Sequence, residues 1–412
     1  MRGTTVFREL VSRLLRSRRV GFAVFGNGMF SLASFLLSIS VARSSSIEVF
    51  GAFSLALVAY QFVSGFISSA LTDTALSRPD DPATFTRAFQ RASLLGVVAA
   101  VVLLAWGLLS GNAYIVVFGV SVHGLLLMDF LRMFDSAAGS ATRAVVTTSA
   151  WSLTSLAISA SSLFLAIDPV VVFTGWAVTG AICGYATMRA VGVPQLPGWE
   201  RERPDSRAAV VFSADYLIGQ GGIHLTTGLL GLLDDARVLG AVRGAGTLLG
   251  PMNLIATTAG SLMLPYLARD QQNPGRQLKS AVAAAGVQVV VLAPLLILLQ
   301  FIPDSVGEQL LGDTWQYAAV AILPLSIDSI LSVCTGVAIS GHRVNFAGRR
   351  TLFLRIGLGI PRPLVILFSA YSWGIEGAAW SMALFALISA VSWWLSFHGL
   401  ARRAARQPSY VK

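Results

Sequence analysis

Long apolar runs, each about as long as a membrane-spanning helix, follow one another along almost the whole chain. The hydrocarbon core of a bilayer requires about 20 predominantly apolar residues in helical form. Runs of this kind, separated by charges or by Gly and Pro, predict twelve spans. Their expected ranges are 20–42, 49–72, 92–110, 113–131, 145–166, 169–190, 208–232, 238–262, 281–302, 316–338, 352–371 and 374–397.

The basic residues lie mostly on one side of this predicted topology. Most of the 30 Lys and Arg residues fall in the two terminal tails and in the connections that follow even-numbered spans, whereas the opposite connections hold only Arg43 and Arg237. Cytoplasmic loops of membrane proteins carry an excess of Lys and Arg. We therefore expect a multi-pass protein of the cell membrane with both termini in the cytoplasm.

The composition supports an all-α polytopic membrane fold. Of the 412 residues, 55% are apolar and 12% are charged, whereas charged residues make up about 25% of a soluble domain. The net charge of +10 is spread over short connections, so it predicts orientation in the membrane and no nucleic-acid partner. Cys183 and Cys334 lie inside apolar runs, where we interpret them as free thiols, and no metal-ligand cluster is expected.

A Pro-rich, charged connection predicts that the chain consists of two lobes. We expect residues 1–19 to be a basic cytoplasmic segment, 20–190 and 208–397 to form six-span lobes, 191–207 to link them, and 398–412 to be a basic tail. Segment 1–19 has the pattern of an amphipathic helix at the lipid surface, although a purely topogenic signal is an equal alternative. Val49 to Phe53 has a counterpart in Val238 to Val242, as expected of parallel repeats.

Three stretches resemble the polysaccharide flippases of the multidrug/oligosaccharidyl-lipid/polysaccharide exporter superfamily. The first runs from Ala42 to Ala56 and includes Glu48 to Phe53. The second runs from Asp234 through Gly240, Gly244 and Pro251 to Leu264–Arg269, and the third is Leu310–Trp315. The resemblance implies two six-helix lobes around a central cavity that opens alternately to each side.

Ionisable side chains within the spans are the strongest candidate site residues, because each costs about 2.5 to 3.5 kcal/mol on insertion scales unless a partner or water compensates. Arg362 lies between Pro361 and Pro363, which predict a broken helix, and Arg355 lies on the same face two turns earlier. Such a guanidinium pair would suit a pyrophosphate. In the alternative interpretation, Arg362 pairs with Asp328 and both residues are structural.

Other charged residues have less specific expectations. Arg243, before a kink predicted at Pro251, is a second candidate for binding an anion. Asp215 is either a proton or ion site or a structural acceptor. Asp73 and Asp129 lie near the cytoplasmic ends of their spans, and we interpret both as ordinary solvated charges, with Asp129 paired to Arg132.

Uncharged polar residues form helical rows on three spans. We expect their informative members to line a hydrated cavity and contact sugar hydroxyls, whereas the serines among them are better explained by helix packing. The informative members are Asn27, Gln61, Gln220 and His224. His123 does not belong to such a row of polar residues, and we interpret it as a polar residue at a helix interface.

These features together predict a transporter rather than an enzyme. The hypothesis is a flippase that moves a polyprenyl-pyrophosphate-linked oligosaccharide from the cytoplasmic to the external leaflet by alternating access of the two lobes. Two alternatives are a cation-coupled multidrug exporter, which should carry an acid in its first span, and a membrane-embedded glycan polymerase or ligase, which needs larger external loops. We expect membrane lipid, the lipid-linked substrate and other polysaccharide-assembly proteins as partners, and no cofactor, with H+ or Na+ open as the coupling ion.

Overall fold

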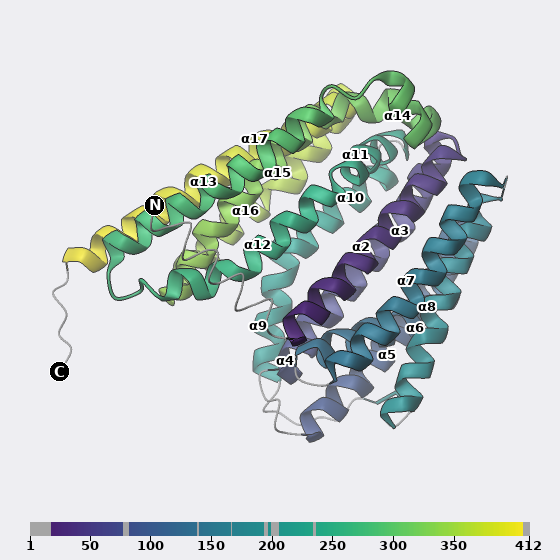
Figure 1. Ribbon diagram of the computed structural model, residues 1–412, viewed down its shortest axis with the longest axis horizontal. Helices are drawn as coiled ribbons and strands as arrows, with labels where there is room; N and C mark the ends of the chain where they lie inside the picture. The colour runs from purple at the N-terminus through teal and green to yellow at the C-terminus, as the bar shows by residue number, and fades with distance from the viewer. Residues whose placement is uncertain are drawn as a thin grey trace. The chain divides into compact units, whose positions relative to one another are not determined.

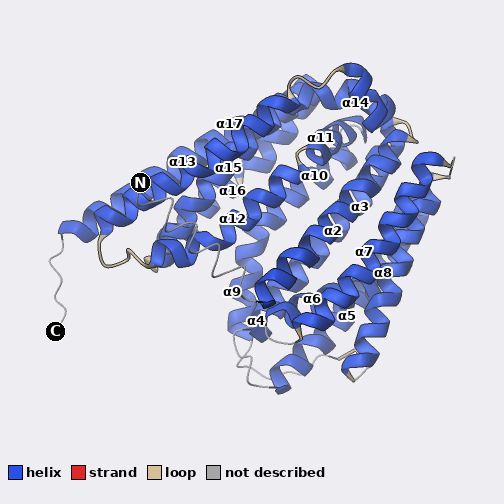
Figure 2. Ribbon diagram, viewed as in Figure 1, coloured by secondary structure: helices blue, strands red, loops and turns tan. Residues whose placement is uncertain are grey.

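The structure is a computed structural model, and its described residues form helices joined by short loops and contain no strand (Figure 2). The described residues are 18–76, 82–137, 140–165, 167–192, 197–198, 206–233 and 236–406. Residues 1–17 of the segment 1–19, most of the linker 191–207, and residues 407–412 of the tail 398–412 lie outside them. The expectations for these segments stay predictions.

The chain divides into two compact units, whose helices are labelled in Figure 1. Unit 1 comprises Met1–Ser44 and Leu55–Leu217, and unit 2 comprises Ser45–Ser54 and Ile218–Lys412. The helices of unit 1 are α2 (Arg18–Arg43), most of α3 (Ile47–Ile67), the π-helix η1 (Ser68–Thr72), α4 (Asp73–Leu76), α5 (Pro82–Ser110), α6 (Ala113–Ala137), α7 (Ala141–Phe164), α8 (Pro169–Val191) and α9 (Ser206–Tyr216). Those of unit 2, after the π-helix η2 (Leu217–Gly221), are α10 (Gly222–Leu233), α11 (Ala236–Leu248), α12 (Gly250–Ala268), α13 (Pro274–Leu299), α14 (Asp304–Leu311), the 3-10 turn η3 (Gly312–Thr314), α15 (Trp315–Val344), α16 (Gly348–Gly359) and α17 (Pro361–Arg406).

Each predicted span overlaps one helix or two or three consecutive ones, so the all-α membrane fold is confirmed. Among the described residues, seven helices are long and apolar enough to cross a membrane, or eight if Ala236–Leu248 and Gly250–Ala256, bent by 60°, form one span. One of the seven, Gly348–Arg403, contains two of the predicted spans. A non-helical break at Trp373 and Gly374 separates them, where Gly374 has a φ of 59°. These are the features of a multi-pass membrane protein.

Local sequence signals set several helix ends. Asp168 caps α8 by accepting a hydrogen bond from the backbone N–H of Val170, and Pro169 supplies a preset φ in the first turn. The helix ends at Gly192, whose φ of 70° is readily adopted only by glycine. Asn273 and Pro274 begin α13 in the same way.

The second half of the chain enters unit 2 at a point inside a helix, and this point is the division between the units. It lies at Leu217 and Ile218, inside η2, because α9 packs on η1 of unit 1. Ser69 donates a hydrogen bond to the Phe212 carbonyl at 2.9 Å, and Tyr216 donates one to the Phe62 carbonyl at 2.9 Å. The first turns of α3 instead belong to unit 2, where Glu48 pairs with Arg237 at 2.7 Å.

Aromatic side chains fill the core of unit 1. Trp176 on α8 contacts the rings of Trp151 and Phe173 at centroid distances of 5.3 and 5.5 Å, and that of Tyr60 on α3 at 5.6 Å. Trp151 also donates a hydrogen bond to the Trp176 carbonyl at 2.9 Å. This cluster fixes α3, α7 and α8 around α6, and it therefore positions the polar groups that α3 and α6 share.

Small residues and a buried histidine organise the helix contacts elsewhere. In unit 1, α6 and α8 approach so closely that a Cβ at Gly124 would lie 2.7 Å from the Ala181 Cα. In unit 2, His342 at the end of α15 is fully buried and bonds Ser396 on α17 at 2.9 Å. Its ring contacts those of Trp393 and Phe397.

Candidate functional site

The guanidinium of Arg362 and the carboxylate of Asp328 lie together in unit 2. The sequence predicts a break at the proline pair, and the structure has an interruption of one residue there: α16 ends at Gly359, α17 begins at Pro361, and Ile360 between them keeps helical φ and ψ values of −72° and −46°. The break places Nη2 of Arg362 3.6 Å from Oδ1 of Asp328, and the two side chains are 22% and 21% exposed. Oδ1 of Asp328 has no hydrogen-bond partner among the described residues. The two groups thus form an ion pair without a hydrogen bond.

Arg355 lies against the π-helix η2. A Cβ added at Gly219 would lie 2.5 Å from Nη1 of Arg355, so the guanidinium is positioned over a residue that has no side chain. Gly359 makes the second close approach, because a Cβ there would lie 2.7 Å from the Ile218 carbonyl oxygen. Two glycines therefore allow α16 to pack directly on η2. Gln220, the next residue of η2, is exposed.

Arg243 and His224 form a second group in unit 2. His224 lies on α10 and Arg243 on α11, and these two helices pack together. Both side chains are half-buried, and Arg243 is the charged group that acts electrostatically on His224. The kink expected at Pro251 is present as the 60° bend between α11 and α12.

The remaining predicted site residues belong to unit 1, and the structure does not join them into one group. Gln61 on α3 and Asp215 on α9 are half-buried, and both have polar contacts. Asn27 lies on α2, but its side chain is outside the described residues. The roles assigned to these residues from the sequence stay predictions. Among the described residues, no three His, Cys, Asp or Glu side chains are clustered in a way that could hold a metal ion.

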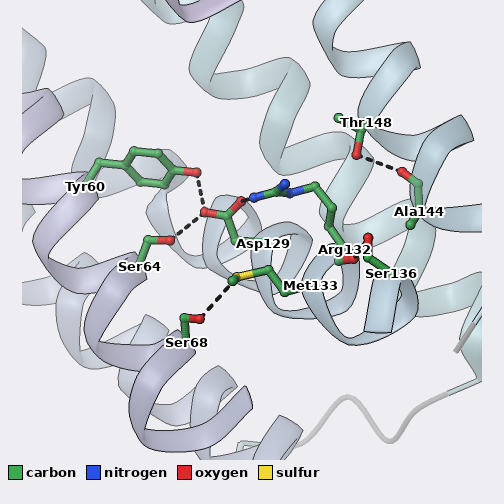
Figure 3. A network of polar contacts seen from close by, with 9 residues as sticks. All are labelled: Tyr60, Ser64, Ser68, Asp129, Arg132, Met133, Ser136, Ala144 and Thr148. Atoms are coloured by element: carbon green, nitrogen blue, oxygen red, sulfur yellow. Dashed lines mark hydrogen bonds and ion pairs between the residues drawn. The ribbon is translucent and has the colours of Figure 1, made fainter. Parts of the chain in front are cut away.

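Asp129 on α6 is the main correction to the sequence interpretation. The expected pair with Arg132 is present at 3.3 Å, but Asp129 is not a solvated charge, since only 6% of the residue is exposed. Its carboxylate also accepts hydrogen bonds from the hydroxyls of Tyr60 and, at 2.6 Å, Ser64, both on α3 (Figure 3). The signal available in the sequence was the run of apolar residues around Asp129, which indicates burial.

His123 is likewise better connected than its sequence context indicates. Its Nε2 lies 3.0 Å from the hydroxyl of Ser93 on α5, and its Nδ1 lies 2.8 Å from the hydroxyl of Tyr185 on α8. The interpretation as a polar residue at a helix interface is correct. The ring links three helices of unit 1.

Comparison with known proteins identifies the fold. No protein-family model matches the chain, and no curated protein matches it by sequence. Among solved structures, an inward-facing multidrug resistance MATE family transporter of the MOP superfamily aligns with a TM-score of 0.71 and 10% identity, over 92% of this chain and 96% of the other. The lipid II flippase MurJ, in an inward closed conformation, aligns with a TM-score of 0.66 and 9% identity, over 94% and 91%.

A third similar structure is archaeal. A MOP superfamily transporter from Pyrococcus furiosus Vc1, described as having a binding pocket of reversed polarity, aligns with a TM-score of 0.61 and 12% identity, over 96% of this chain and 98% of the other. These solved structures are transporters and a flippase rather than enzymes. At such low identities they establish the fold alone, and the chain has the fold of the MOP superfamily transporters.

Proposed function

We propose that this protein is an alternating-access transporter that moves a polyprenyl-pyrophosphate-linked oligosaccharide from the cytoplasmic to the external leaflet. Its fold is shared with multidrug transporters and with a lipid II flippase, and structures of the former are described in both inward-facing and outward-facing conformations. The two compact units would be the bodies that move. The lipid tail would stay in the bilayer while the head group crosses.

The observation that carries this proposal is that Arg362 lies beside a carboxylate without forming a hydrogen bond to it. An arginine at the depth of the membrane is retained only where a partner or a wet cavity compensates its charge. Its carboxylate partner lies at 3.6 Å without a hydrogen bond, and the side chain keeps 22% of its exposure. A guanidinium has five N–H donors in a planar fork that matches phosphate oxygens. Arg362 is therefore held near Asp328 but retains donors for an anionic ligand.

Arg355 supports the same assignment. It lies on α16, and the break between α16 and α17 separates it from Arg362. We assign the two guanidinium groups to the pyrophosphate, with Asp328 limiting how tightly the anion is held. Gln61, Gln220, His224 and Asn27 are assigned to the sugar hydroxyls, and Arg243 is assigned to a second anion contact.

The test is transport by the full chain in proteoliposomes that contain a fluorescent polyprenyl-pyrophosphate oligosaccharide. A membrane-impermeant reductant reports which leaflet holds the label. Arg362→Gln should slow flipping about ten- to a hundred-fold, since hydrogen bonds to charged groups contribute about 1.5 to 3 kcal/mol. Arg349→Gln is the matched control. Arg349 is exposed near the start of α16, and its substitution should leave the flipping rate unchanged.

Two outcomes would overturn the proposal. If Arg362→Gln lowers the amount of folded protein but not the rate per folded molecule, Arg362 and Asp328 are structural. If the liposomes transport cationic dyes and not the lipid-linked glycan, the protein is a multidrug exporter. In cells, deletion should trap lipid-linked glycan in the cytoplasmic leaflet, whereas accumulation on the external side would indicate a polymerase or ligase.

A further inference from the structure

Phe346 adopts a backbone conformation that residues other than glycine rarely adopt. It lies in the turn between α15 and α16, and its φ of 50° is the only positive value at a non-glycine residue in the described part of the chain. This left-handed region brings Cβ too close to the following carbonyl oxygen. Gly or Asn is the usual residue at such a helix end. The sequence has Asn345 one position earlier and Gly348 two positions later, so the strained position falls on a phenylalanine.

The end of α15 holds Phe346 in this conformation by two backbone hydrogen bonds. The N–H of Ala347 donates to the His342 carbonyl at 3.0 Å, and the N–H of Phe346 donates to the Arg343 carbonyl at 3.1 Å. These are the two bonds of the Schellman motif, which requires a left-handed residue at the position of Phe346. The strain therefore cannot relax without loss of the helix end.

Two side chains from the connection between α12 and α13 fix the turn from outside. Gln271 donates a hydrogen bond to the Val344 carbonyl at 2.8 Å. Gln277 is fully buried, accepts a bond from Asn345 at 2.8 Å, and donates one to the Leu267 carbonyl at 3.2 Å. A strained residue persists only where the surrounding structure determines its conformation in this way. The turn is thus a rigid mount for Phe346.

The ring of Phe346 gains little from packing inside unit 2. The residue is 88% exposed, whereas its neighbours Asn345 and Ala347 are half-buried. In the predicted topology Phe346 lies between spans 316–338 and 352–371, outside the hydrocarbon core and on the side where we expect the cytoplasm. Strained residues are frequent at positions that bind ligands. An exposed aromatic ring beside the ends of membrane-spanning helices is suited to the region of the lipid head groups.

Basic side chains lie at the same end of unit 2. Here α12, α13, α15 and α17 share one apolar core, whose members include Leu267, Ala281, Val344 and Phe397. The exposed cations at this end of the four helices are Arg269, Arg276, Lys279, Arg343, Arg402 and Arg403. They come from separate parts of the chain and are brought to one end of the unit by the shared core.

Little negative charge balances these cations. In the described ranges 263–285, 337–346 and 393–406 the single acidic residue is Asp270. Its carboxylate already pairs with Arg276 at 3.0 Å and accepts a hydrogen bond from Ser280 at 2.6 Å. This end of unit 2 therefore has a positive potential that attracts anions.

The charge and the exposed ring together favour an anionic lipid as the ligand. The cytoplasmic leaflet contains anionic lipids that attract Lys and Arg side chains near its surface. A Phe ring strengthens such binding by removing apolar surface from water at the boundary between head groups and acyl chains. A soluble anion would satisfy the cations but would make no use of the ring.

We propose that this end of unit 2 is a binding site for an anionic phospholipid, with Phe346 as its apolar anchor and the exposed cations of the four helices as contacts for the head group. Because the turn holds the ring outside unit 2 before lipid binds, binding requires no ordering of the turn. The bound lipid fixes the ends of α12, α13, α15 and α17 to the leaflet. The site does not depend on which substrate the protein carries.

Thermal unfolding of the full-length protein in neutral detergent, with phosphatidylglycerol or phosphatidylcholine added, tests the site. Phosphatidylglycerol should raise the Tm by about 5 to 10 °C at about 100 times its dissociation constant, and phosphatidylcholine should not. Glycerol phosphate has the charged group without acyl chains and should have little effect. Added salt should weaken the response to phosphatidylglycerol, because it screens the cations.

Two substitutions of Phe346 separate the ring from the strain. Phe346→Ala keeps the strain and removes the ring, so it should weaken phosphatidylglycerol binding about ten-fold or more. Phe346→Gly also removes the strain, so its Tm without lipid should exceed that of Phe346→Ala while its lipid response stays weak. Phe353→Ala is the matched control. Phe353 is 79% exposed on α16, within the predicted span 352–371, and its substitution should keep the full response.

A charge substitution completes the test. Arg402→Gln should weaken phosphatidylglycerol binding about five-fold, whereas Arg189→Gln, at an exposed position in the last turn of α8 in unit 1, should not. Equal Tm responses to the two lipids would overturn the proposal. So would a Phe346→Gly variant that melts lower than the wild type and keeps the lipid response, because Phe346 would then be structural. A full response in Phe346→Ala would also overturn it and would leave the ring for a partner protein.

Discussion

The contact between α16 and η2 depends on Gly359 having no side chain. In Gly359→Ala the added methyl carbon would lie 2.7 Å from the Ile218 carbonyl oxygen and 3.2 Å from its Cγ2. A backbone carbonyl within a helix cannot move aside, so α16 must withdraw from η2. The guanidinium of Arg355, carried on α16 over Gly219, would move with it.

The size of the effect follows from two opposing terms. Overpacking of a tight contact costs about 1 to 3 kcal/mol, whereas replacing Gly by Ala in a helix gains up to about 1 kcal/mol. Gly357→Ala isolates the second term, because a Cβ there meets nothing within 4 Å on the same helix. Gly359→Ala should therefore be less stable than Gly357→Ala by about 1 to 3 kcal/mol.

Thermal unfolding of the purified full-length variants in detergent measures this difference. For a domain of about 150 to 250 residues, about 1 kcal/mol corresponds to a Tm change of about 2 to 4 °C, so Gly359→Ala should melt about 2 to 12 °C below Gly357→Ala. Flipping of the fluorescent substrate should also fall in Gly359→Ala and not in Gly357→Ala. Equal Tm values for the two variants would show that α16 does not pack on η2 as described.

Three further predictions concern packing. Gly184→Ala should lower the Tm, at a cost of about 1 to 3 kcal/mol, because the added carbon overlaps the backbone of α6, whereas Gly336→Ala, with open space around it, should leave the Tm equal or higher. Trp151→Phe should cost about 0.5 to 1.5 kcal/mol, because it removes the indole N–H that donates to the Trp176 carbonyl while Thr179 still donates to that carbonyl, and chemical unfolding would measure the loss. His123→Phe should destabilise the protein by about 1 to 3 kcal/mol, because it leaves the two hydroxyls on α5 and α8 without their partner, and an unchanged midpoint would contradict that linkage.

The sequence was sufficient for the helices and for most of their breaks. Apolar runs of about 20 residues have one stable form in a bilayer, since every backbone polar group must be bonded within the segment. Pro361, Pro251 and Gly374 marked the interruptions because their effects on the backbone are local. The same local physics does not reveal the π-helices η1 and η2, which contain no proline and whose extra residue is accommodated by tertiary packing.

The partners of the buried polar groups were decided by the tertiary structure. Tyr60 and Asp129 are 69 residues apart in the sequence, and no periodicity within either helix indicates that they meet. From the sequence alone Asp129 is therefore interpreted as a surface charge, whereas in the structure the residue is buried. For Arg362 the sequence left two interpretations, substrate contact or a pair with Asp328, and the structure places that carboxylate at 3.6 Å without a hydrogen bond. Hydrophobic pattern and charge bias act along the chain and fix the spans, whereas the environment of each polar side chain depends on which helices pack beside it.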